Sequence, residues 1–185
     1  MRRLSVFIQV SLDGYYSDSK SDMSWARKHD AEWNEFVSGN ASGDGELVFG
    51  RVTYQMMASF WPTPQAMQML PAVAEGMNRM KKVVFSRTLD KAEWNNTRLL
   101  KGDLVEEVRK LKSEPGPGMV ILGSGSIISQ LADAGLIDDF QVAVNPIVLG
   151  SGKSMFATVK NRTNLKLTKT RAFTNGNVLL CYEPA

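Results

Sequence analysis

The 185-residue chain is 43% hydrophobic, enough for one substantial core, and it is too short for two ordinary domains with separate cores. Its net charge of +3 is small and its basic residues are scattered, so nucleic acid is not expected as a partner. One histidine and one cysteine, Cys181, make no disulfide and no zinc cluster, and we predict no metal. We expect a single domain over residues 1–185. Because neither a signal-peptide pattern nor a membrane-spanning apolar run is present, we expect it to be cytoplasmic, with no membrane partner.

Strand and helix patterns alternate through the first half of the chain. Apolar residues at every second position predict a strand over 4–12 with one apolar face. Residues 59–80 carry three prolines and four of the ten methionines, which predicts a flexible insertion or lid. Its methionines fit gap-filling core positions better than a specialised surface. Between these segments we expect a short helix over 30–36, a strand over 46–49 and a helix that begins within 50–54.

The second half ends in a hairpin pattern. Asp103 and Glu106 form a capping arrangement that predicts a helix over 103–112. Asn175-Gly176 has the chemistry of a two-residue hairpin turn. The other expected elements are strands over 82–85, 119–122 and 140–144, a helix after the glycines near 125, and hairpin strands over 165–173 and 178–182. Because alternation comes first and hairpin pairing last, we predict an α/β fold with a mostly parallel central sheet, an antiparallel C-terminal hairpin and flanking helices.

The strongest functional signal is the apolar strand over 119–122 that runs into a glycine turn at 123–127 and then into a helix. Glycines let the backbone approach an anion closely, and the N–H groups and dipole of the following helix favour negative charge. Ile128 stands where a Rossmann dinucleotide fingerprint has its third small residue, so the turn alone is a weak signal.

Two other strand ends support it, because ligands of open α/β sheets bind at the carboxyl ends of strands. Arg51 and Arg87 offer paired donors for phosphate oxygens, and hydroxyl groups lie beside both. Either arginine alone is better explained as a surface charge, but their coincidence with the glycine turn indicates a phosphorylated cofactor. The candidate cofactor-binding residues are Gly50, Arg51, Val52, Thr53, Ser86, Arg87, Thr88, Gly123, Ser124, Gly125, Ser126 and Ile127.

Five segments in order resemble the dihydrofolate-reductase-like superfamily: Leu12-Asp13-Gly14, residues 50–54, Ser86-Arg87, residues 122–125 and residues 146–152. The resemblance spans nearly the whole chain and is closer to the branch related to the reductase half of the bifunctional riboflavin-biosynthesis deaminase-reductase. It implies a single-domain, three-layer fold and NADPH as hydride donor. It also implies that Gly50–Thr53 and the glycine turn hold the pyrophosphate, and that Ser86 and Arg87 hold the 2′-phosphate. A homodimer through the C-terminal hairpin and residues 140–149 is implied as well.

The activity implied by the resemblance is NADPH-dependent reduction of a pterin-like or ribosylamino-pyrimidine-like heterocycle. Trp25, Trp33 and Trp61, with Phe60, are candidate walls of the substrate site, although each ring is equally explained as core. A noncatalytic nucleotide-binding or ligand-sensing module on the same fold is the alternative.

The proton source is expected to be Asp30, Asp13 or an ordered water. Asp30 fits a helix N-cap slightly better, and Asp13 fits a turn equally well. His29 is interpreted as a solvated side chain. The segment that ends in Lys153 and Ser154 imitates a Walker A loop, but Ile147 occupies the position of its first glycine, so we reject that motif and interpret Lys153 as solvated.

Overall fold

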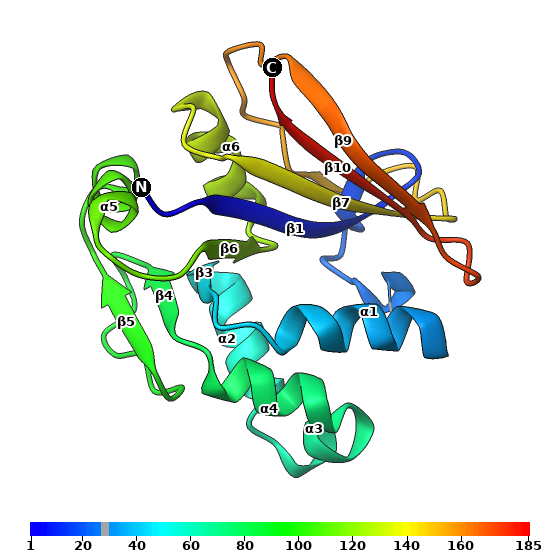
Figure 1. Cartoon of the computed structure of the whole chain (residues 1–185), viewed down its shortest axis with the longest axis horizontal. Helices are drawn as coiled ribbons and strands as arrows, with labels where there is room; N and C mark the ends of the chain where they lie inside the picture. Colours follow the sequence, from blue (N-terminus) through cyan, green and yellow to red (C-terminus); the bar gives the residue numbers. More distant parts are fainter. Residues whose placement is uncertain (27–29) are drawn as a thin grey trace.

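The computed structural model describes residues 1–26 and 30–185, so His29 lies outside the described residues. Its centre is an eight-stranded sheet in the order β5-β4-β3-β6-β1-β7-β10-β9 (Figure 1). The strands are β1 (Leu4–Ser11), β3 (Glu46–Gly50), β4 (Lys82–Phe85), β5 (Thr97–Leu100), β6 (Met119–Leu122), β7 (Asp139–Asn145), β9 (Leu165–Ala172) and β10 (Val178–Pro184), and a separate pair is formed by β2 (Tyr15–Ser17) and β8 (Lys153–Ser154). The first six strands in this order, β5, β4, β3, β6, β1 and β7, are mutually parallel, and β10 runs antiparallel to β7 and β9. The predicted α/β class and sheet are confirmed.

Helices cover both faces of the sheet. They are α1 (Ala31–Ala41), α2 (Arg51–Phe60), α3 (Pro64–Met69), α4 (Pro71–Arg79), α5 (Leu104–Ser113) and α6 (Gly125–Asp133), with a 3-10 turn at Ser24–Ala26. Figure 1 shows α5 and α6 on one side of the sheet and α1, α3 and α4 on the other. None of the helices in the described ranges is both long and apolar enough to cross a lipid bilayer.

The alternation of β1 explains how the two layers differ. Leu4, Val6, Ile8 and Val10 are buried in the core beneath α5 and α6. Since successive side chains point to opposite faces, the intervening residues of β1 face the side of α1 and α4. This second face is filled only in part, which leaves a cavity beside β1.

A cluster of aromatic rings fixes α1 to the C-terminal hairpin. Trp33 is buried, and its ring meets that of Phe173 edge-on with centroids 4.9 Å apart. Phe36 packs against both rings. Burial of rings of this size stabilises a domain by ~2 kcal/mol each, so the cluster holds α1 over β7 and β10.

The segment 59–80 is not the flexible insertion that its composition predicts. It forms α3 and α4, and Val73, Met77 and Met80 pack into a core against β3 and β4. Pro64 and Pro71 stand in the first turns of these helices, where proline has no N–H bond to lose and its fixed φ suits the helix. The prolines therefore begin helices instead of breaking them.

Two smaller predictions concern the ends of elements. The expected cap is confirmed, because the Asp103 carboxylate accepts from the N–H groups of Val105 and Glu106. The predicted two-residue hairpin turn is wrong: Phe173 N–H donates to the Asn177 carbonyl, which leaves a three-residue loop over 174–176. Gly176 ends this loop with φ +88°, the left-handed conformation that such loops require.

Candidate functional site

A groove of about 530 Å³ lies where β3, β4 and β6 end. We call it the charged groove, because Arg51, Arg87, Lys153 and Asp103 line it. Both arginines are exposed, and no ion pair joins either one to a carboxylate in the described part of the chain. Their guanidinium groups are therefore available to an anion. Of the candidate cofactor-binding residues, the groove is lined by Gly50, Arg51, Val52, Thr53, Ser86, Arg87, Ser124, Gly125, Ser126 and Ile127.

The N-termini of α2 and α6 open onto this groove without a side chain to cap them. The N-cap side chains of α1, α3 and α5 each accept backbone N–H groups of their own helix, whereas the N-caps of α2, α4 and α6 do not. Of these three, α2 and α6, with N-caps Gly50 and Ser124, begin at the groove. Among the described residues no N-cap side chain matches the first-turn N–H groups of these two helices, although Ile127 N–H donates to the Ser124 carbonyl at 2.9 Å. The positive dipole ends of both helices therefore face the groove. Two such ends at one groove make a site for a phosphate-bearing ligand.

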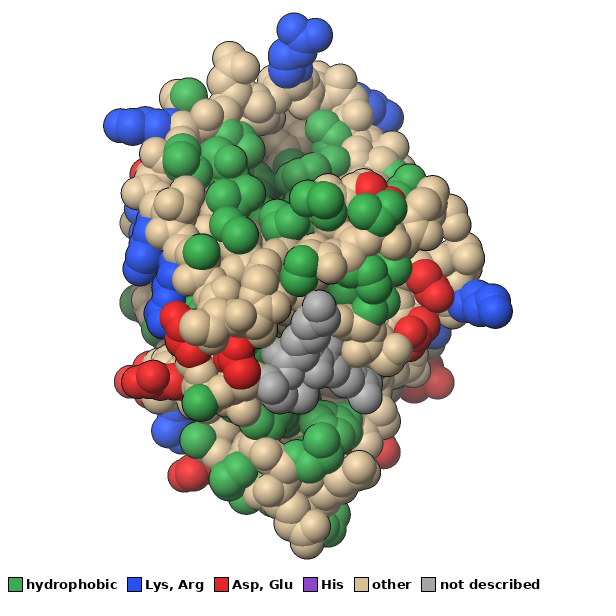
Figure 2. Space-filling model, turned by 90° about the vertical axis from the view of Figure 1, so that its right-hand side faces the viewer, with side chains coloured by type: hydrophobic (Ala, Val, Ile, Leu, Met, Phe, Trp, Pro, Cys, Tyr) green, Lys and Arg blue, Asp and Glu red, His purple; other side chains and the backbone are tan. Residues whose placement is uncertain are grey.

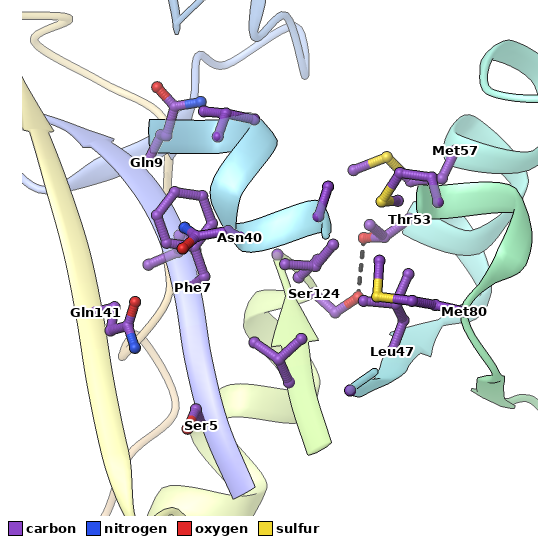
Figure 3. Close-up of a pocket in the computed structure, with 18 of the residues that line it drawn as sticks. Ser5, Phe7, Gln9, Asn40, Leu47, Thr53, Met57, Met80, Ser124 and Gln141 are labelled. Atoms are coloured by element: carbon purple, nitrogen blue, oxygen red, sulfur yellow. Dashed lines mark hydrogen bonds between the residues drawn. The ribbon is translucent and has the colours of Figure 1, made fainter. Parts of the chain in front are cut away.

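Ser124 ties the two helix starts together. Its hydroxyl accepts from Gly50 N–H at 2.9 Å and donates to Thr53 Oγ1 at 2.8 Å (Figure 3). Ser124 also adopts φ +65° and ψ +63°, directly after Gly123 at φ +64°. A serine seldom adopts this left-handed conformation, and the two hydrogen bonds compensate for its strain.

Close packing explains the second glycine of the turn. A Cβ added to Gly125 would lie 2.5 Å from Tyr16 Cε1, so a larger residue would displace the tyrosine ring. Tyr16 is half-buried, and its burial raises the pKa of its phenol above the ordinary value near 10. It therefore stays protonated at neutral pH.

A second cavity of about 480 Å³ adjoins the groove, and we call it the apolar cavity (Figure 3). It lies on the partly filled face of β1, between α1 and the helices α2 and α4, and Phe7, Met57 and Met80 are among its walls. Its described lining contains no Asp, Glu, Lys, Arg or His. The residues that line both spaces are Tyr16, Met23, Thr53, Met56 and Ser124.

Not all the predicted site residues fall in these spaces. Trp61 lines the apolar cavity, and Gly123 lines it instead of the groove. Thr88 lines neither; its N–H donates to Ser86 Oγ and so shapes the turn that presents Ser86. Lys153, interpreted from the sequence as solvated, is exposed but lines the groove, and its Nζ donates to Ser21 Oγ.

Two tryptophans predicted as substrate walls lie elsewhere. Trp33 belongs to the aromatic core cluster described above, because α1 turns this ring toward the hairpin. Trp25 is half-buried in the 3-10 turn, where its Nε1 donates to the Asp22 carbonyl. Neither ring lines the cavity or the groove, and Phe60, which also lines neither, meets the Trp61 ring edge-on.

The two carboxylates predicted as proton sources are held in structural positions. Asp30 is the N-cap of α1, accepting from Trp33 N–H at 2.7 Å, so its N-cap interpretation is confirmed. Asp13 accepts from the N–H groups of Leu149 and Gly150 and joins the loops after β1 and β7. A hydrogen bond from Ser11, with these backbone bonds, lowers the pKa of Asp13. Neither carboxylate lines the groove or the cavity.

Several polar side chains at the site were missed from the sequence. Gln9, Asn40 and Gln141 line the apolar cavity and come from β1, α1 and β7 (Figure 3), and Tyr16 stands between the two spaces. The available signal was the polar side of β1: a strand at the middle of a sheet with helices on both faces has no solvent to explain Gln9. In the described residues, no three His, Cys, Asp or Glu side chains gather to hold a metal ion.

The family model of the RibD C-terminal domain matches residues 2–179. The chain belongs to this family. A relative in Bacillus subtilis (strain 168), the uncharacterized protein YyaP, is 30% identical over 183 residues, which cover 98% of this chain and 95% of YyaP. The resemblance inferred from the sequence is thus confirmed for the family.

Solved structures include proteins whose fold is similar to that of this RibD C-terminal domain protein. A protein of Shewanella sp. PV-4 named for riboflavin biosynthesis superposes with a TM-score of 0.74 at 22% identity, covering 99% of both chains. Dihydrofolate reductase from Enterococcus faecalis, solved with NADP(H), gives a TM-score of 0.66 at 15% identity, over 98% of this chain and 96% of the reductase. The chain therefore shares its fold with these two proteins.

Proposed function

We propose that this protein is an NADPH-dependent reductase that reduces a C=N or C=O carbon of a small flat heterocycle. The observation that carries the proposal is the junction of the two spaces. Two helix N-termini without side-chain caps border the charged groove, together with two arginines that no described carboxylate pairs. The groove meets a largely apolar cavity at Thr53 and Ser124. An anionic cofactor and an apolar substrate ring would meet at this junction.

The residues of the groove fit such a cofactor. The first-turn N–H groups of α2 and the glycine turn before α6 would hold the pyrophosphate. Ser86 and Arg87, at the end of β4, would hold the 2′-phosphate. When bound, the cofactor supplies the hydride, and the protein supplies orientation and exclusion of water.

Tyr16 is our candidate for the donor of the proton that accompanies the hydride. It lines both spaces, and no hydrogen bond to another described residue occupies its hydroxyl. Burial raises the pKa of Tyr16, so the phenol carries its proton at neutral pH, and its place between the two spaces puts that proton beside the junction. This proposal replaces Asp13 and Asp30, which line neither space.

The experiment is a turnover assay with NADPH and a panel of pterins, pyrimidine ribosides and unsubstituted fused heterocycles, followed by loss of the nicotinamide absorbance. We expect oxidation of NADPH that depends on one of these compounds and on the wild-type groove. The Arg87→Ala variant should require more NADPH for the same rate.

The noncatalytic module remains a second candidate, since no described carboxylate lines the apolar cavity. It predicts that NADPH and a heterocycle bind together without any oxidation of NADPH. Turnover of a single compound in the panel would exclude it.

A further inference from the structure

The two adjoining spaces differ sharply in charge. The charged groove is lined by Arg51, Arg87 and Lys153, whereas the described lining of the apolar cavity has no ionised side chain at neutral pH. Its lining includes neutral hydrogen-bonding side chains: the hydroxyl groups of Ser5, Thr53, Ser124 and Tyr16, and the three amides of Gln9, Asn40 and Gln141. The charged groove therefore suits an anionic group, and the apolar cavity suits an uncharged one.

A phosphate or carboxylate in the apolar cavity would lose its hydration without gaining a cation from any described residue of the lining. Transfer of an unpaired charge from water to such surroundings is strongly unfavourable. The walls contributed by Phe7, Met57 and Met80 offer only dispersion contacts, and the flexible methionines can adapt to a flat ring. The cavity thus disfavours an ionised ligand.

The three amides supply recognition without charge. Gln141 Nε2 donates to Asp139 Oδ2 at 2.9 Å, which fixes the orientation of that amide. Gln9 is the neighbour of buried Asn145, whose Nδ2 lies 3.5 Å from Gln9 Oε1. Asn40, from α1, also lines the cavity and is drawn in Figure 3. Each amide carries a donor and an acceptor, which matches the N–H and C=O groups on the edge of a neutral heterocycle.

We propose that the substrate is an uncharged flat heterocycle with amide-like edges and without a phosphate or carboxylate group. The proposal rests on the proposed reductase function. It separates this protein from a reductase of phosphoribosylamino-pyrimidines, because such a substrate brings its own phosphate. The only phosphates held at the junction would then be those of the cofactor.

The test compares matched pairs of probes: pterin with pterin-6-carboxylate, quinoxaline with quinoxaline-2-carboxylate, and uridine with uridine 5′-phosphate. Binding is followed by tryptophan fluorescence and by thermal shift, with and without NADPH. We expect at least one uncharged probe to bind about tenfold or more tightly than its charged partner. Equal or tighter binding of the charged members, or no binding of any probe, would overturn the proposal.

Variants place the effect in the cavity. Gln9→Lys should remove the preference by supplying a cation inside the cavity, whereas Gln68→Lys adds the same charge on exposed α3, away from both spaces, and should leave it unchanged. If Gln68→Lys changed the preference as much as Gln9→Lys, the selectivity would come from net charge and the proposal would fail. If NADPH failed to bind while the uncharged probes still bound selectively, the reductase function would fail and the assigned ligand class would stand.

Discussion

Ser124 Oγ donates a hydrogen bond to Thr53 Oγ1 at 2.8 Å, and this contact joins the start of α6 to the start of α2. The same oxygen accepts from Gly50 N–H, so one hydroxyl sets the distance between two helix N-termini. Both residues also line the apolar cavity. A single side chain therefore organises the place where the proposed cofactor and substrate meet.

Replacement of this hydroxyl should weaken the groove. In Ser124→Ala, Gly50 N–H loses its partner and the left-handed residue loses the bonds that hold it, so we expect a loss of about 1–2 kcal/mol in unfolding free energy. NADPH affinity should fall about tenfold, since two helix ends are no longer fixed. Calorimetric titration and thermal unfolding measure both effects.

Ser59→Ala is the matched control, because Ser59 is exposed on α2 and lines neither the groove nor the cavity. If the two variants behaved alike, the bridge between α2 and α6 would have no special role.

Tyr16→Phe tests the proton donor. We expect turnover of an active compound to fall about a hundredfold, since general acid catalysis contributes at least that much, while the Kd for NADPH changes less than about threefold. Tyr15→Phe removes a neighbouring hydroxyl that lines neither space and should retain full activity. Unchanged turnover in Tyr16→Phe would assign the proton to another group, such as water.

The buried ammonium of Lys82 should make the stability of the fold depend on pH. It is fully buried, and its ammonium donates to the carbonyls of Asn78, Met80 and Asn95 and lies over the Trp94 ring. Burial lowers the pKa of Lys82 to about 8. Between about pH 8 and its ordinary pKa of 10.5, the unfolded chain binds more protons at this site than the folded one, so this contribution to stability rises with pH.

Lys82→Met should lose this alkaline rise and about 2–4 kcal/mol of unfolding free energy at neutral pH, because three carbonyls lose their donor. Denaturant unfolding across this pH range measures both, with the exposed neighbour Lys81→Met as control. The same pH profile in Lys82→Met and wild type would contradict the assignment.

The C-terminal hairpin carries the proposed homodimer contact. β9 is an edge strand, and Leu165, Leu167 and Val178 are 38%, 49% and 37% exposed on it and its partner β10. We propose that a second copy covers this surface, and expect sedimentation at micromolar concentration to show a dimer that Leu167→Lys converts to monomer. Leu12→Lys, at a residue 68% exposed after β1, should leave the dimer intact. A wild-type monomer would contradict the proposal.

The surface charge agrees with the scattered basic residues of the sequence. Figure 2 shows the basic side chains of one face mainly at its margins, without a gathered basic patch.

The fold followed from the sequence where local chemistry and tertiary packing agree. The strands β1 and β6 and the cap at Asp103 are fixed by alternation and by short-range hydrogen bonds. The segment 59–80 differs because proline marks both a break and a helix start, and only burial of Met77 and Met80 decides between them. β5 was missed because it is a short edge strand, with Thr97 and Leu100 only half-buried.

The charged groove could be predicted and the apolar cavity could not. Strand ends carrying glycine, serine and arginine meet at one edge of a parallel sheet, so their sequence positions already indicate a shared site. The cavity instead depends on the distance of α1 and α4 from β1. This distance cannot be predicted from the sequence of β1. For the same reason the orientation of α1 decided that Trp33 became core.

The most direct test of the account is a titration of the protein with NADPH and NADH, in the wild type and in Arg87→Ala, followed by tryptophan fluorescence. The account predicts that the wild type binds NADPH about tenfold or more tightly than NADH, and that Arg87→Ala loses this preference while still binding NADH. Failure of the wild type to bind either nucleotide, or a preference for NADPH unchanged in Arg87→Ala, would contradict it.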